Sequence, residues 1–297
     1  MRKRARRHGA RVTAAIVAGA FVLTACGRLT GAGGGTGGTD STSPGIDHPT
    51  GPTELVLRVE LEGGFVPIEY TLRRVPSWSL YGDGRVIVEG PQIEIYPGPA
   101  LPNLLTFRIT EEAVQAILEA AREAGLTQGN ARYPQPCVAD APTTVFTVTA
   151  EGRTSVVSAE ALDLGPSSCP GVDEEARGKL RAFWTKLTDL ASWLPEGQVG
   201  SEEPYVASEI RVFVGAYRSE PDLAQEPVTW PLETPLARFG EPFESAGERM
   251  RCGVVSGADL ETLRPLFERA NELTPWQSGG ERYRLLLRPL LPDEHGC

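Results

Sequence analysis

Apolar and polar residues alternate in several short segments of the chain, and this pattern predicts half-buried β-strands. Two pairs of these segments are separated by only a few residues. Asp83-Gly84 lies within one pair and Glu151-Gly152 within the other. Glycine accepts a positive φ, so these pairs favour tight hairpin turns. The predicted strands are residues 55–61, 68–72, 78–81, 85–88, 104–109, 144–148, 154–157, 210–214, 250–255 and 283–288.

Longer segments place their apolar residues at helical spacing. The clearest is preceded by Thr110, a good N-cap, begins with two glutamates, and ends before Gly125. Acidic residues in the first turn favour a helix because they interact well with its dipole, and glycine favours its end. The helices predicted in this way are residues 111–124, 173–193 and 258–271.

These elements predict the α+β class, with a mainly antiparallel sheet and about three amphipathic helices. We expect one α+β domain in residues 54–195 and a smaller one in residues 205–297, packed on the first. The proline-rich residues 219–247 are expected to be irregular. A strand–helix–strand order occurs in residues 104–148 and again in residues 252–287, which is typical either of two similar sub-domains or of two unrelated units.

The first 26 residues follow the pattern of an export signal. Six basic residues and no acidic ones precede the twelve-residue run Val12–Leu23, in which nothing is more polar than a threonine. Spanning a bilayer takes about 20 residues, so this run has instead the length of a signal-peptide core. It ends in Leu23-Thr24-Ala25-Cys26, which resembles the lipobox of bacterial lipoproteins.

The lipobox resemblance implies that residues 1–25 are a signal peptide and are removed. It also implies that the Cys26 thiol carries diacylglycerol, with fatty acids such as palmitate, and holds the protein at the membrane. A plain secretory peptide with a chance cysteine is the alternative.

Residues 26–53 are dominated by glycine, threonine, serine and proline and contain little to bury. Such a composition predicts a flexible tether. Gly33–Gly38 matches the G-x-G-x-x-G pattern, but a dinucleotide site needs a strand before it and a helix after it, and neither is predicted on its flanks. His48 falls in this segment and is expected to be solvated rather than a ligand.

Four cysteines remain after Cys26, an even number in a chain predicted to be exported. Three pairings are possible, and proximity in the sequence favours Cys137–Cys169 and Cys252–Cys297. No C-x-x-C pair occurs, so a zinc site is the weaker interpretation. We expect no metal and no cofactor.

The charge of the chain excludes one class of partner. The formal net charge is -10, and residues 26–297 are more acidic still, with 23 of the 29 basic residues against all 39 acidic ones. A surface this acidic repels phosphates, so we expect no nucleic-acid binding.

Motifs of catalysis are missing from the sequence. His295 is the only histidine after the predicted tether, and no G-x-S-x-G, S-x-x-K or H-E-x-x-H pattern occurs. A pair of carboxylates remains available for glycoside hydrolysis, with Asp140 the first to inspect. Trp230 and Trp276 lie in predicted loops, where they would cover the core or serve as exposed contacts for a partner.

Residues 70–162 are similar to a small domain of many bacterial exported proteins. The resemblance rests on Leu80–Ile87 (LYGDGRVI), on Ala124–Leu126 (AGL) and on Ala139–Thr144 (ADAPTT). The chain as a whole, including Arg288–Pro292 (RPLLP), resembles uncharacterised actinobacterial lipoproteins. That resemblance implies no activity and transfers no functional residue.

The sequence therefore predicts a lipoprotein on the outer face of the cytoplasmic membrane that is a non-enzymatic binding or accessory protein, with an envelope protein or a cell-wall glycan as its partner. The alternative is a carboxylate-dependent hydrolase of cell-wall or other glycans.

Overall fold

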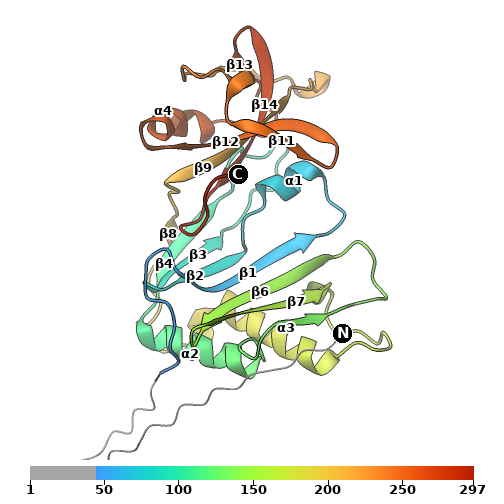
Figure 1. Ribbon diagram of the computed structural model, residues 1–297, viewed down its shortest axis with the longest axis vertical. Helices are drawn as coiled ribbons and strands as arrows, with labels where there is room; N and C mark the ends of the chain where they lie inside the picture. Colours follow the sequence, from blue (N-terminus) through green and yellow to red (C-terminus); the bar gives the residue numbers. More distant parts are fainter. Residues whose placement is uncertain (1–44) are drawn as a thin grey trace, which may run out of the picture. The chain divides into compact units, whose positions relative to one another are not determined.

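The computed structural model describes residues 45–297, which form one compact unit containing two β-sheets (Figure 1). The sheets are mainly antiparallel and carry three sizeable helices, which confirms the predicted α+β class.

The first sheet has eight strands in the order β5-β7-β6-β1-β2-β3-β4-β8. Only β5 and β7 pair in parallel. Helices α2 (Glu111–Glu123) and α3 (Glu174–Thr188) pack together beneath this sheet (Figure 1). The strands are β1 (Leu55–Gly63), β2 (Trp78–Tyr81), β3 (Arg85–Glu89), β4 (Leu104–Arg108), β5 (Ala131–Tyr133), β6 (Pro142–Ala150), β7 (Arg153–Glu160) and β8 (Glu203–Pro204).

The second sheet has six strands in the order β10-β13-β14-β9-β12-β11, and in this sheet only β10 and β13 are parallel. Helix α4 (Gly257–Phe267) covers one face and buries Leu263 and Phe267 against it. The strands are β9 (Glu209–Ala216), β10 (Val228–Thr229), β11 (Glu241–Ser245), β12 (Glu248–Ser256), β13 (Trp276–Ser278) and β14 (Glu281–Pro289).

The two strand–helix–strand units differ in topology. In the first sheet three strands separate β4 from β6, whereas in the second sheet only β9 separates β12 from β14. The shared order of elements therefore does not extend to a shared arrangement of strands.

The structure corrects one predicted strand. Residues 68–72 belong to helix α1 (Ile68–Arg73), in which no residue is buried. The alternation of Ile68, Tyr70 and Leu72 indicated a strand, but Pro67 fixes a φ that is compatible with a helix start. Glu69 also forms an ion pair with Arg284 of β14, which holds α1 against the second sheet.

The predicted tether is wrong from residue 45 onward. The backbone N–H of Ile46 donates to Gln115 Oε1 (2.7 Å), and the carbonyl of Asp47 accepts from the N–H of Glu151 (2.7 Å). His48, expected to be solvated, has a side chain only 5% exposed, with Nε2 2.9 Å from Glu111 Oε1. Polar contacts with α2 and with the turn after β6 thus hold this segment, and Ile46 packs on the first core.

The segment 219–247 is less irregular than predicted. It contains β10 and β11, and β11 pairs antiparallel with β12 along its whole length. Phe243 of β11 packs on Phe213 of β9, with ring centroids 5.1 Å apart. Cross-strand packing of this kind stabilises a strand that has no clear alternation of its own.

The chain after β14 joins the two sheets. Leu291 packs against Tyr81 of β2 and Ile87 of β3. Asp293 accepts hydrogen bonds from Arg58 and from the hydroxyl of Tyr81, both at 2.7 Å. Cys297 is bonded to Cys252 of β12, so the C-terminus is fixed to the second sheet.

Candidate functional site

The structure pairs the cysteines as proximity predicts, with Cys137 bonded to Cys169 and Cys252 bonded to Cys297. Cys26 lies outside the described residues, so its predicted lipidation stays a prediction. Among residues 45–297, no helix combines the length and apolar character that crossing a bilayer requires.

Trp230 and Trp276 do not offer an exposed contact for a partner. They are 5% and 1% exposed and meet edge to face, with ring centroids 6.1 Å apart. Phe239 and Phe267 pack on them in the same geometry. Their large apolar area therefore stabilises the second core, as loop tryptophans often do.

Asp140 is also separate from any site. It is exposed, has a φ of 63°, and its carbonyl accepts a hydrogen bond from Phe65. The residue therefore serves the loop before β6 rather than a catalytic pair.

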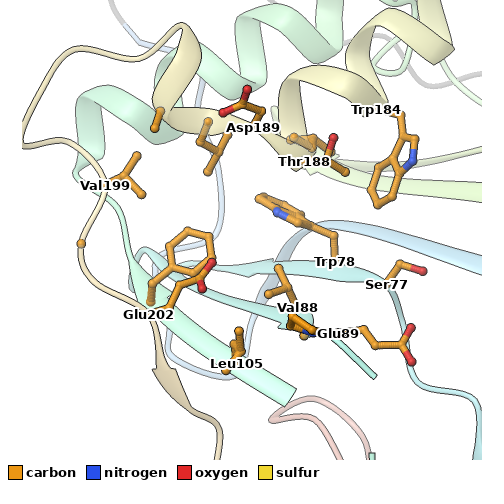
Figure 2. Close-up of a pocket in the computed structure, with 17 residues that line it drawn as sticks. Ser77, Trp78, Val88, Glu89, Leu105, Trp184, Thr188, Asp189, Val199 and Glu202 are labelled. Atoms are coloured by element: carbon orange, nitrogen blue, oxygen red, sulfur yellow. The ribbon is translucent and has the colours of Figure 1, made fainter. Parts of the chain in front are cut away.

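A cavity of about 660 Å³ lies between the first sheet and the end of α3, and we call it the tryptophan cavity. Its floor is formed by β2, β3 and β4, and its roof by the end of α3 and the turn that follows. Trp78 lies in its middle and Trp184 projects into it from α3 (Figure 2). The apolar lining consists of Trp78, Val88, Pro91, Leu105, Phe107, Trp184, Leu187, Leu190, Ala191 and Val199.

Local sequence positions the two tryptophans. Trp78 opens β2, where its register with Val88 of β3 turns it toward the helical layer, and it is only 2% exposed. Trp184 follows the buried Phe183 on α3 and remains partly accessible. Together they give the cavity one buried and one accessible aromatic surface.

Three carboxylates lie in the lining of the tryptophan cavity: Glu89, Asp189 and Glu202. Glu89 is at one side next to Ser77, Asp189 is in the roof, and Glu202 is at the opposite side (Figure 2). Within residues 45–297 none of the three forms an ion pair. No arginine, lysine or histidine belongs to the lining, so the cavity is acidic.

Burial raises the pKa of Glu89 above its ordinary value, and the charge of Arg74 opposes this effect. Glu89 stands at the mouth of the cavity and is exposed, so only part of its surface is removed from water. A partly desolvated carboxylate is a strong hydrogen-bond acceptor when ionised, and a proton donor when protonated.

The indole nitrogen of Trp78 is a donor without an acceptor in the described part of the chain. Buried donors are normally satisfied, so each exception calls for a physical explanation. This nitrogen is closed off from the surface, however, so it does not offer its hydrogen to a ligand in the cavity. The cavity therefore combines an apolar wall with three free carboxylate acceptors.

Comparisons with family models, curated proteins and solved structures find no match for this chain. The chemistry of the cavity must therefore be argued from its own residues. Over residues 45–297, no group of three or more histidine, cysteine, aspartate or glutamate side chains is arranged to hold a metal ion.

Sequence reasoning missed the tryptophan cavity. It placed Trp184 and Asp189 in the predicted helix 173–193 and Trp78 in the predicted strand 78–81, but it gave no functional role to any of these residues, to Glu89 or to Glu202. The one available signal was Trp78 at the start of a short apolar strand, beside a second tryptophan on a helix predicted to cover the same sheet.

Proposed function

We propose that this protein is a cell-envelope lipoprotein, held at the outer face of the cytoplasmic membrane through Cys26, whose folded part binds a carbohydrate in the tryptophan cavity. The cavity carries the proposal. Its volume of about 660 Å³ lies in the range of small-molecule sites, which are mostly apolar with a few placed polar groups.

A sugar ring fits the groups of this cavity better than a purely apolar molecule does. The C–H face of a pyranose packs on an aromatic ring, for which Trp184 offers its accessible surface. Sugar hydroxyls donate to carboxylates such as Glu89 and Asp189. An anionic group would be repelled, because the cavity has three carboxylates and no cation in its lining.

Export and anchoring rest on the lipobox resemblance of Leu23–Cys26. Mass spectrometry of protein from native membranes tests this part separately. The expected product begins at Cys26 and carries diacylglycerol on its sulfur. Recovery of a chain with an intact Met1 would overturn the anchoring.

Titration calorimetry measures the binding of N-acetylglucosamine oligomers to the folded protein. Trp184→Leu removes the accessible ring while keeping an apolar side chain, and we expect it to weaken binding about tenfold, as the loss of a central aromatic contact does. Trp193→Leu is the matched control, because Trp193 is also partly buried near the end of α3 but lies outside the cavity lining. Equal affinity in both variants would contradict the proposal.

A second candidate function is hydrolysis of the bound glycan. The observation that favours it is Glu89, a carboxyl group whose pKa is raised by burial, in one cavity with two other carboxylates. A general acid needs such a pKa, and a glycosidase needs a second carboxylate near the scissile bond. Release of reducing ends by the wild type, abolished in Glu89→Gln, would favour hydrolysis over binding alone.

A further inference from the structure

A second cavity adjoins the tryptophan cavity and shares two residues with it, Ser77 and Glu89. Its volume is about 310 Å³, and we call it the arginine cavity. Its walls come from α1 and the residues after it, and from the loop between β3 and β4. Because Ser77 and Glu89 line both hollows, the two cavities form neighbouring parts of one groove.

Arg74 gives the arginine cavity a positive charge. Its Nη1 donates to the carbonyls of Leu61 (2.8 Å) and Gly63 (3.1 Å), and its Nε is buried without an acceptor in the described part of the chain. No carboxylate of residues 45–297 lies within ion-pair distance of it. The guanidinium is thus positioned by backbone oxygens and its charge remains available, whereas its buried Nε is closed to a ligand.

Of the other charged groups in the arginine cavity, Arg73 and Glu272 are paired with each other. Glu89 forms no ion pair, but its charge interacts with that of Arg74. Arg73 lies 3.3 Å from Glu272 and also donates to the carbonyls of Pro99 and Ala100. Glu272 in turn accepts from the N–H of Gly98 at 3.0 Å. Arg74 is therefore the group that a ligand anion would meet.

The arginine cavity also presents apolar surface to water. Tyr70 and Ile93, which both line it, are 57% and 65% exposed. The ring of Tyr70 lies 5.1 Å from the guanidinium carbon of Arg74, so the cation is held against an aromatic face. Aromatic and apolar surface beside a fixed cation suits a second sugar unit that carries an acid.

We propose that the groove binds an acidic oligosaccharide, with a neutral ring in the tryptophan cavity and the carboxylate of the next unit at Arg74. This inference rests on the proposed function and deepens it. The charges favour one direction of the chain, because the first cavity has three carboxylates and no cation, whereas the second holds Arg74, which forms no ion pair. Glu89 and Ser77 lie where the two units join.

The test uses three probes that differ in one group. They are the disaccharide of N-acetylglucosamine and N-acetylmuramic acid, its methyl ester, and the neutral disaccharide of N-acetylglucosamine, each titrated by calorimetry into the folded wild-type protein. We expect the free acid to bind about tenfold more tightly than the ester, because a charge-assisted hydrogen bond is lost on esterification. The advantage should shrink as the salt concentration rises.

Arg74→Gln should remove the preference for the acid over the ester. Arg122→Gln, on the exposed face of α2, is the matched control and should keep the preference. The comparison of acid with ester in the wild type does not depend on the folding of any variant.

The outcomes separate the two proposals. Equal binding of acid and ester by the wild type overturns the two-unit groove and leaves the carbohydrate site intact. Absence of binding by all three probes overturns the proposed function and this inference with it. A peptide with a free C-terminus that binds more tightly than the acidic disaccharide, and loses that affinity in Arg74→Gln, overturns the assignment to a glycan.

Discussion

Gly240 shows how a single residue determines the pairing of β11 with β12. Its φ is +63°, and a Cβ placed there would collide with the carbonyl oxygen of Cys252. Gly247, at the other end of the same hairpin, has a φ of +79° but open space around it. A side chain at Gly247 would therefore meet only backbone strain, whereas a side chain at Gly240 would meet both strain and a steric collision.

We expect Gly240→Ala to lower the free energy of unfolding by about 3 kcal/mol, since strain and collision add. Gly247→Ala should cost only about 1 kcal/mol, the strain of a left-handed residue. Urea denaturation of both variants measures the difference. Equal losses would contradict the close approach seen at Gly240.

At the same scale, Glu89 predicts a pH dependence of stability. The pKa of Glu89 is raised in the folded state above its ordinary value of 4.5. Between these two pKa values, Glu89 is protonated more often in the folded protein than in the unfolded one. The wild type therefore loses stability over this window as the pH rises, and the loss is complete above the raised pKa.

Glu89→Gln removes this ionisation. We expect the variant to gain stability over the wild type between about pH 4 and neutral pH, and to show no such gain at about pH 3, where the wild-type carboxyl is protonated in both states. Thermal melts across this range provide the measurement. Glu202→Gln at the opposite side of the cavity is the comparison, and a gain that did not change with pH would rule out the ionisation of Glu89 as its cause.

At the scale of elements, the sequence predicted those parts that local patterns determine. Helix α2 begins after Thr110, whose side chain accepts from the N–H of Ala113, and it is followed by Gly125 with a φ of 83°. The hairpin of β6 and β7 turns at Glu151 and Gly152, both with positive φ. Caps and turns of this kind depend on neighbouring residues, so the sequence alone shows them.

The failures have a different origin. Alternation suggested a strand at residues 68–72, yet α1 has no sheet neighbour there and is held by the ion pair of Glu69 with Arg284. Strand β11 lacks alternation and forms because β12 lies beside it. The ion pair of α1 joins segments distant in the sequence, and β11 adds to its hairpin the distant contact of Phe243 with Phe213 of β9. Such contacts override local preference.

The candidate site is a more extreme case of the same dependence. Trp78, Glu89, Trp184 and Glu202 meet only because the strand order places β2 and β3 below the end of α3. Nothing in the spacing of these residues indicates that they share a cavity. The disulfides, in contrast, were predicted because short separations limit the plausible pairings.

At the scale of the molecule, an ion pair couples the two sheets. It joins Arg58 of β1 to Asp293, which follows β14 in the sequence. Arg58 is 9% exposed, and its Nη2 lies 2.7 Å from Asp293 Oδ1. Burial opposes the positive charge, but the hydrogen bond and the charge of Asp293 outweigh it and raise the pKa of Arg58. The ion pair therefore makes the stability of the first sheet depend on the C-terminal residues of the second.

Asp293→Ala would leave this guanidinium buried without its carboxylate. We expect a loss of about 3 kcal/mol in the free energy of unfolding, as for other broken buried pairs, measured by urea denaturation followed by tryptophan fluorescence. Asp222→Ala is the control, because Asp222 is exposed in a loop of the second half and should change stability by less than about 0.5 kcal/mol. An equally small loss in Asp293→Ala would show that the two sheets are held together without this pair, through the apolar contacts of Leu291 and the ion pair of Arg284 with Glu69.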